Sequence, residues 1–154
     1  MINTVRYGTP NTEYAMSMAM MSPEDDGPVW MVNLMKYRAV ADYADGRESA
    51  ISGRDDIVVT PSVVRAGRDA DDAYSPLDSL AAVGAAPVFF GDVDQQLLGD
   101  ATTWDRIGVV KYPTRKAFID MQSLPSFQKS HHHKDAGMES TIVIGTQPME
   151  MPTP

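Results

Sequence analysis

The sequence predicts a single α+β domain built on a four-stranded antiparallel sheet. Four apolar segments have the length and composition of strands, and helical patterns separate the first strand from the second and the third from the last. This order is the split β-α-β-β-α-β unit of the ferredoxin-like fold. A chain of 154 residues has the usual length of one domain and can bury a sizeable core.

Residues 1–27 are expected to form an N-terminal arm and helix. Asn11 or Thr12 can cap a short helix that runs to about Met21, because short polar side chains accept hydrogen bonds from the first free backbone N–H groups. The methionines of this helix are expected to fill the core rather than bind a metal. Ser22–Pro28 is a turn cluster.

The first strand is expected at 29–37, where apolar residues occupy both faces. One face carries an amide in its middle, Asn33. If this amide is buried, it must find hydrogen-bond partners. It either bonds to a neighbouring loop backbone or presents its amide to a ligand.

Residues 38–73 form a long insertion without clear periodicity. Such a segment is often a lid, a subunit arm or an ordered surface loop. Its arginines could clamp an anionic ligand, but the aspartates beside them favour solvated ion pairs. These arginines are Arg54, Arg65 and Arg68.

The next helix is expected to begin with Ser75 as N-cap and Pro76 at its first position, and to end near Gly84. The second strand, 87–98, is expected to kink or bulge at Gly91. The third strand, 104–112, suits an antiparallel hairpin with the second.

Thr114 is expected to cap a further helix, which Ser123–Pro125 interrupts. A second helical piece runs to Gly137, and the last strand follows at 138–146. Phe118 is expected to face the core. The domain therefore spans 28–147, and the Pro-rich tail 148–154 is expected to be loose.

Composition excludes several classes of partner and site. A net charge of −8 and a pI near 4.7 argue against nucleic acid and against an anionic membrane surface. The absence of cysteine excludes disulfides and thiolate metal sites. No apolar run approaches the about 20 residues that span a bilayer, and the N-terminus lacks the pattern of a secretory signal. We therefore expect a cytoplasmic protein.

The three histidines of the chain are consecutive, at 131–133. Histidine changes charge near neutral pH and is the usual residue for moving protons. The run is either a solvated helix end or a functional group. Because consecutive helical residues point about 100° apart, the three cannot all face one pocket. His131 lies four residues after Phe127 and is expected to share its core-facing side.

Three segments resemble small dimeric α/β-barrel proteins, in particular the domain-of-unknown-function group numbered thirteen-thirty. Gly27–Arg38 resembles the opening strand of that group. Trp104–Arg106, leading into Val110–Arg115, resembles its third strand and second helix start. His133–Gly137 is similar to its His-Arg-x-Ala-Gly segment, with Lys134 in place of arginine.

The resemblance implies a homodimer whose two sheets pack face to face, with a small cavity between each sheet and its own helices. The wider superfamily includes cofactor-free monooxygenases, lactone isomerases and decarboxylating or dehydrating enzymes, and some relatives bind heme. The histidine that matches is His133, and nothing transfers to His131 or His132. On this ground we favour His133 over His131 as the residue that faces a pocket.

We therefore expect a small cofactor-independent enzyme that acts on a small, largely apolar carbonyl, lactone or polyketide-like molecule by proton transfer, as a lyase, isomerase or monooxygenase. His133 or His131 would be the general base, with Asp105 as its carboxylate partner. Asn33 would hold the developing oxyanion. The expected substrate-binding residues are Tyr37, Phe90, Trp104, Arg106 and Phe118, although each aromatic ring could instead be core filler.

Two other functions stay open. The chain could be a non-catalytic dimeric small-molecule-binding protein whose insertion completes the pocket. It could also bind a metal or heme, with two histidines of the run and Asp135 or Glu139 as metal ligands, although no His-x-x-x-His spacing is present.

A homodimer is also expected from the strands themselves. Apolar residues occur on both faces of the predicted sheet, and two helices can cover only one face. A second copy of the sheet is the simplest cover for the other.

Overall fold

The computed structural model describes residues 6–43 and 76–153. In this part of the chain, four strands form one antiparallel sheet with the order β2-β3-β1-β4. The strands are β1 (Val29–Tyr37), β2 (Ala86–Asp92), β3 (Arg106–Tyr112) and β4 (Met138–Thr146). The chain by itself is an open sheet, not a barrel, and its topology fits the ferredoxin-like fold.

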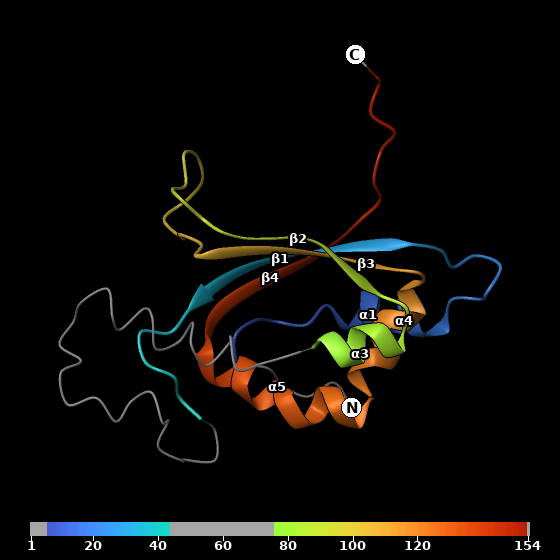
Figure 1. Cartoon of the computed structure of the whole chain (residues 1–154), viewed down its shortest axis with the longest axis horizontal. Helices are drawn as coiled ribbons and strands as arrows, with labels where there is room; N and C mark the ends of the chain where they lie inside the picture. The colour runs from blue at the N-terminus through green and yellow to red at the C-terminus, as the bar shows by residue number, and fades with distance from the viewer. Residues whose placement is uncertain (1–5, 44–75, 154) are drawn as a thin grey trace.

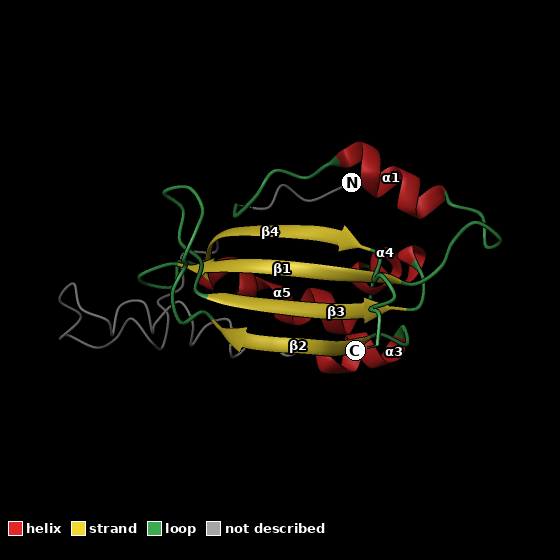
Figure 2. Ribbon diagram, turned by 90° about the horizontal axis from the view of Figure 1, so that it is seen from above, coloured by secondary structure: helices red, strands yellow, loops and turns green. Residues whose placement is uncertain are grey.

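The helices lie on one side of the sheet (Figures 1 and 2). They are α1 (Thr12–Met20), α3 (Leu77–Ala82), α4 (Arg115–Gln122) and α5 (Pro125–Gly137). The main core fills the space between them and the sheet. It consists of Met18, Val29, Met31, Leu80, Ala85, Tyr112, Ala117 and Met121.

Local sequence signals account for most helix ends. The Asn11 side chain accepts a hydrogen bond from the backbone N–H of Tyr14 and caps α1. Thr114 caps α4 in the same way through Ala117. Gly84 follows α3 at φ +73°, a left-handed conformation that favours glycine, and it ends that helix as expected.

A second cap on α4 comes from a distant turn. The Asp26 carboxylate accepts hydrogen bonds from the backbone N–H groups of Gly27, Arg115 and Lys116 at 2.8, 2.8 and 3.0 Å. Burial alone would raise the pKa of Asp26, but these three donors and the charge of Arg115 lower it overall. Asp26 therefore ties the 22–28 turn to the start of α4.

The bounds of β1 and β4 are those expected from the sequence, and other expectations need correction. The second strand ends at Asp92 rather than at residue 98, and the third begins at Arg106 rather than at Trp104. The register shift lies between Pro87 and Phe89, not at Gly91, because Gly91 pairs regularly with Ile107.

The helix α3 begins one residue later than expected. Pro76 is its N-cap rather than its first helical residue, and no side chain caps this end. Ser75, the insertion from residue 44 onward and its arginines lie outside the described residues, so the expectations for them stay predictions.

The sheet face away from the helices, the open face, is apolar. Directly paired residues of an antiparallel sheet share a face, so the register gives the apolar residues in the middle of this surface: Trp30, Val32, Leu34, Phe89, Ile107, Val109, Ile142 and Ile144. Phe89, Ile142 and Ile144 are exposed, and the others are half-buried. No described segment covers this face.

Candidate functional site

The histidine run lies in the second half of α5, and its outer members have different partners. The Tyr7 hydroxyl lies 2.9 Å from Nε2 of His131. The Tyr43 hydroxyl lies 2.8 Å from Nδ1 of His133. The ring centroids of His132 and His133 are 4.0 Å apart. The three side chains therefore do not converge on one point, as the helical rotation of about 100° per residue requires.

His131 faces the inside of the molecule. Its ring lies 4.9 Å from that of Phe127, as the spacing of four residues predicts. Burial lowers the pKa of His131, Lys134 lowers it further, and Asp135 partly opposes them. The imidazole is therefore neutral at pH 7. In the tautomer that carries its proton on Nδ1, Nε2 accepts a hydrogen bond from the Tyr7 hydroxyl.

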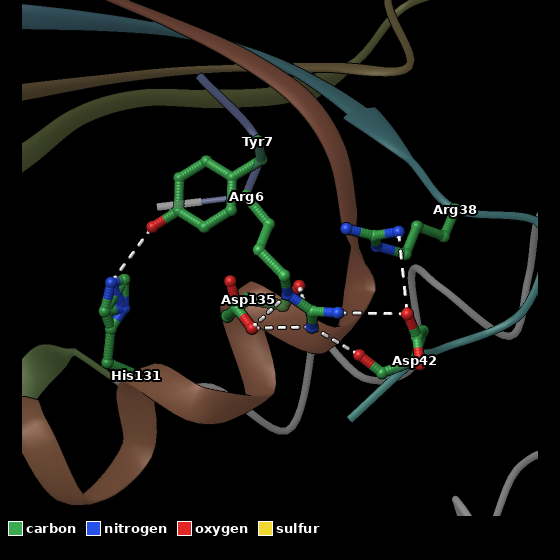
Figure 3. Close-up of polar contacts among 6 residues, drawn as sticks. All are labelled: Arg6, Tyr7, Arg38, Asp42, His131 and Asp135. Atoms are coloured by element: carbon green, nitrogen blue, oxygen red, sulfur yellow. Dashed lines mark hydrogen bonds and ion pairs between the residues drawn. The ribbon is translucent and has the colours of Figure 1, made fainter. Parts of the chain in front are cut away.

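Four charged residues fix the segments around this pair (Figure 3). Arg6 donates to the Asp135 carboxylate at 2.6 and 2.9 Å and to the Asp42 carboxylate at 3.0 Å. The hydrogen bond to Asp135 raises the pKa of Arg6. Arg38 lies 3.9 Å from the Asp42 carboxylate. We call Arg6, Arg38, Asp42 and Asp135 the charge network; it holds Tyr7 against α5.

A second polar group lies at the C-terminal end of β1, on the helix side of the sheet. The Arg106 side chain is only 10% exposed, and its Nε donates to the Asp92 carboxylate at 2.9 Å. Its guanidinium carbon lies 5.5 Å from the Tyr37 ring centroid and 5.1 Å from that of Phe90. Two aromatic faces therefore stabilise the buried cation.

Asn33 lies on the same side of the sheet, next to this group. Its amide nitrogen donates to the carbonyls of Met31 and Gly108 at 3.3 and 3.4 Å, which are long for N–H···O hydrogen bonds. Asn33 pairs directly with Gly108 and Val143. These weak contacts leave the amide able to exchange its present acceptors for a better one.

The helices do not fully cover this part of the sheet. Phe90 and Val143 share the helix side with Asn33 and Gly108, yet Phe90 is 61% and Val143 is 44% exposed. We call Asn33, Phe90, Gly108 and Val143 the floor. It offers a polar amide, a glycine backbone and apolar side chains, which is a common composition for small-molecule sites.

One small hydrophobic cluster connects the histidine to the floor. Tyr7 packs in it with Met35, Tyr37 and Met138. Met35 follows Asn33 by two residues on the same face, about 7 Å along the strand. The Tyr7–His131 pair and the floor therefore lie on the same side of the sheet, next to this cluster.

The other expected site residues lie elsewhere. The Asp105 carboxylate accepts a hydrogen bond from the backbone N–H of Tyr37 at 2.8 Å, so it fixes the end of β1, and the carboxylate beside the histidines is Asp135 instead. Phe118 packs against Tyr112 in the main core, at 5.2 Å between ring centroids. Trp104 is half-buried just before β3.

Sequence reasoning missed the tyrosines that bind the histidines. Tyr7 and Tyr43 lie in irregular segments, where no periodicity indicates which way a side chain points. The charge network was missed for the same reason, because Arg6 and Asp135 are 129 residues apart. The only available signal was the concentration of charged and aromatic residues in otherwise irregular segments.

Comparison with known proteins supports the fold and leaves the activity open. Neither a family model nor a curated protein matches the sequence, so the specific group numbered thirteen-thirty is not confirmed. The chain is similar in structure to the RPA0582 protein of Rhodopseudomonas palustris, a protein of unknown function, at a TM-score of 0.70 and 22% identity over 96% of this chain and 100% of that one. The methylated RPA0582 protein matches at a TM-score of 0.71 and 24% identity, over 96% of this chain and 97% of that one.

Two features are absent from the described residues. None of their helices is long and apolar enough to cross a bilayer. No three histidine or acidic side chains among them are grouped as ligands for a metal ion.

Proposed function

We propose that this protein is a small cofactor-independent enzyme that moves a proton on a small, largely apolar carbonyl, lactone or polyketide-like substrate. The observation that carries the proposal is the Tyr7–His131 pair: a neutral, half-buried imidazole in hydrogen-bond contact with a buried hydroxyl. A neutral imidazole is a competent general base at pH 7.

The same observation favours His131 over His133 as the base. A lowered pKa keeps the imidazole of His131 unprotonated, and its side chain faces the interior together with Phe127. Asp135 favours the protonated form and would stabilise the imidazolium that forms when His131 accepts a proton. His133 is engaged by Tyr43 instead.

The proton would reach His131 through Tyr7. The carbon next to the substrate carbonyl gives its proton to the Tyr7 oxygen while the Tyr7 hydroxyl proton passes to Nε2 of His131. The electron pair left on carbon delocalises onto the carbonyl oxygen as an enolate. Return of the proton to another carbon would make the reaction an isomerisation, and loss of a leaving group would make it a lyase reaction.

Asn33 is the proposed partner of the enolate oxygen. Its two present hydrogen bonds are long, so the amide can turn to a stronger, anionic acceptor. Arg106 lies on the same face and adds a fixed positive charge, and Tyr37 and Phe90 contribute apolar surface beside it. The substrate would lie on the floor.

Hydrogen–deuterium exchange at carbon tests the proposal without knowledge of the natural substrate. A panel of small ketones and lactones is incubated with the protein in D2O, and deuterium incorporation next to the carbonyl is followed by NMR. We expect exchange by the wild type, and exchange about a hundredfold slower in His131→Ala and Tyr7→Phe. His132→Ala is the matched control and should retain the wild-type rate.

Other outcomes are equally informative. Equal exchange in the wild type and His131→Ala would remove this histidine from the mechanism. Binding of a probe with no exchange in any variant would favour the alternative, a non-catalytic small-molecule-binding protein. Loss of exchange in His133→Ala alone would return the catalytic role to the histidine that the resemblance favours.

We also propose that the protein is a homodimer of the dimeric α/β-barrel type. The open face is a continuous apolar surface in the middle of the sheet, and leaving it in water would forgo about 25 cal/mol for each Å2 of apolar area. A second copy would cover it through a two-fold interface.

A further inference from the structure

We infer that two projecting segments, 93–104 and 147–153, are arms that clasp a second copy of this chain on the open face. The inference rests on the proposed homodimer and goes beyond it, because it assigns the segments that grip the partner. We call 93–104 the loop arm and 147–153 the tail arm.

The two arms stand at opposite ends of the sheet, on the side away from the helices (Figure 1). The loop arm joins the end of β2 to the start of β3, where Asp92 pairs with Arg106. The tail arm leaves the far end of β4, at Thr146, which pairs with Trp30. The view from above confirms the separation (Figure 2). The open face therefore lies between two segments that project from the same side of the sheet.

Both arms expose large apolar side chains. Leu97 and Leu98 in the loop arm are 100% and 91% exposed. Met149 and Met151 in the tail arm are 85% and 84% exposed. These fractions exceed those of the exposed apolar residues on the open face, Phe89, Ile142 and Ile144. Exposed apolar groups that continue an apolar surface are typical of an interaction site.

The loop arm is held in shape before any partner binds. Gln96 donates to the carbonyl of Thr102 at 3.0 Å, and the N–H of Thr102 donates to the Asp100 carboxylate at 2.8 Å. The first bond closes the segment that carries the two leucines, and the second fixes a turn next to it. A preorganised arm loses less conformational freedom on binding.

The size of the face leaves room for a contribution from the arms. Four strands about 4.8 Å apart and about seven residues long, at about 3.3 Å per residue, cover roughly 440 Å2 in projection. The accessible area of the face is larger than this projection, and a standard interface buries about 800 Å2 of accessible area on each partner. Side chains from two arms on each copy would add to the area that the face itself buries.

The charges also fit a second copy. The carboxylates on the arms are Asp94, Asp100 and Glu150. The open face carries Lys36 and Lys111, near opposite ends of the sheet. Lys36 also lies 4.0 Å from the Glu139 carboxylate of its own chain. Acidic arms and lysines at the ends of the face are complementary between two copies of this chain, which is compatible with self-association.

Sedimentation equilibrium of the full chain tests the inference. The variants are Leu97→Asp with Leu98→Asp, and a chain truncated after Gln147, which keeps the hydrogen bond of Gln147 to Pro28 at 2.9 Å. The matched control is Met16→Asp with Met20→Asp, two exposed apolar residues on α1. We expect each arm variant to raise the dimer dissociation constant at least about tenfold, and the control to stay within threefold of the wild type.

Three results would overturn the inference, and they are distinguishable. If the dimer dissociation constants of the arm variants stay within threefold of the wild-type value, the homodimer is retained and the arms do not contribute to it. A wild type that stays at the chain mass of 16.8 kDa at all concentrations would reject the homodimer as well. Wild-type binding to phosphatidylcholine vesicles, lost in the leucine variant while the dimer is unchanged, would assign the loop arm to a lipid surface. Circular dichroism confirms that each variant is folded.

Discussion

Asp26 connects two segments that are far apart in the chain. Its side chain is 4% exposed and accepts three backbone hydrogen bonds, two of them from residues about 90 positions later. Nothing in its local sequence distinguishes it from Asp25, its neighbour, which bonds only within the turn to Ser22. The sequence predicts the turn but not the long-range cap, because capping from outside the helix has no fixed spacing.

Replacing Asp26 with alanine should therefore be costly. Three backbone donors would lose a charged acceptor, and we expect a loss of about 2 kcal/mol in the free energy of unfolding. The free energy is measured by urea denaturation. Asp25→Ala is the control and should change it by less than about 0.5 kcal/mol, since that side chain is exposed. Equal losses in the two variants would contradict the capping role.

His131 should make stability depend on pH in the mildly acidic range. Its pKa is lower in the folded state than the ordinary 6.5, so the unfolded chain binds the proton more readily. Stability that is fully present above pH 6.5 is therefore lost as the pH falls below that value, until the folded-state pKa is passed. His131→Gln should flatten the dependence of the unfolding free energy between pH 7.5 and 5. Parallel curves for the two proteins would count against a half-buried, neutral imidazole.

At the scale of elements, periodicity and caps predicted most boundaries. β1 and β4 have the expected bounds because each is a long apolar run with clear breakers at its ends. β2 was predicted too long because Val93–Leu98 is apolar enough to resemble a strand, yet it has no strand partner. Partners of that kind are tertiary information, which local composition does not contain.

Gly84 offers a test of the element that precedes β2. Its φ of +73° is unfavourable for a residue with a Cβ, although the space around it is open enough, with the nearest atom at 3.5 Å. Gly84→Ala should therefore cost about 1–2 kcal/mol of stability through backbone strain alone. Gly27→Ala is the matched control, because no atom lies within 4 Å and its φ is not positive. Thermal melts of both variants measure this cost. An unchanged melting temperature in Gly84→Ala would refute the strain argument.

The candidate site could be predicted only in part. The helix side of β1 and the region of the histidines were found from strand alternation and residue chemistry, which place Asn33, Tyr37 and His131 on interior faces. The partners of the histidines could not be found, because Tyr7 and Tyr43 come from irregular segments. Asp105 was assigned to a histidine on chemistry alone, and its position at the strand end gives it a backbone partner instead.

At the scale of the whole molecule, the open face predicts the oligomeric state. We expect a dimer with twice the chain mass of 16.8 kDa at low micromolar concentration, measured by light scattering coupled to size separation. Leu34→Asp places a charge in the middle of the face, opposite Ile107 and Ile142, and should yield monomers. Met16→Asp, at an exposed residue of α1 away from this face, is the control and should remain dimeric. A stable wild-type monomer would reject the barrel.

The central position of β1 also has a consequence for folding. β1 pairs with β3 and β4, so Asn33 must meet Val143, 110 residues further along the chain. The contact order is correspondingly high, and such topologies fold slowly. During synthesis the first apolar strand leaves the ribosome long before either of its neighbours exists. It must therefore stay unpaired until β3 emerges, and a chain stopped before residue 138 would still expose the β4 edge of its most apolar strand to aggregation.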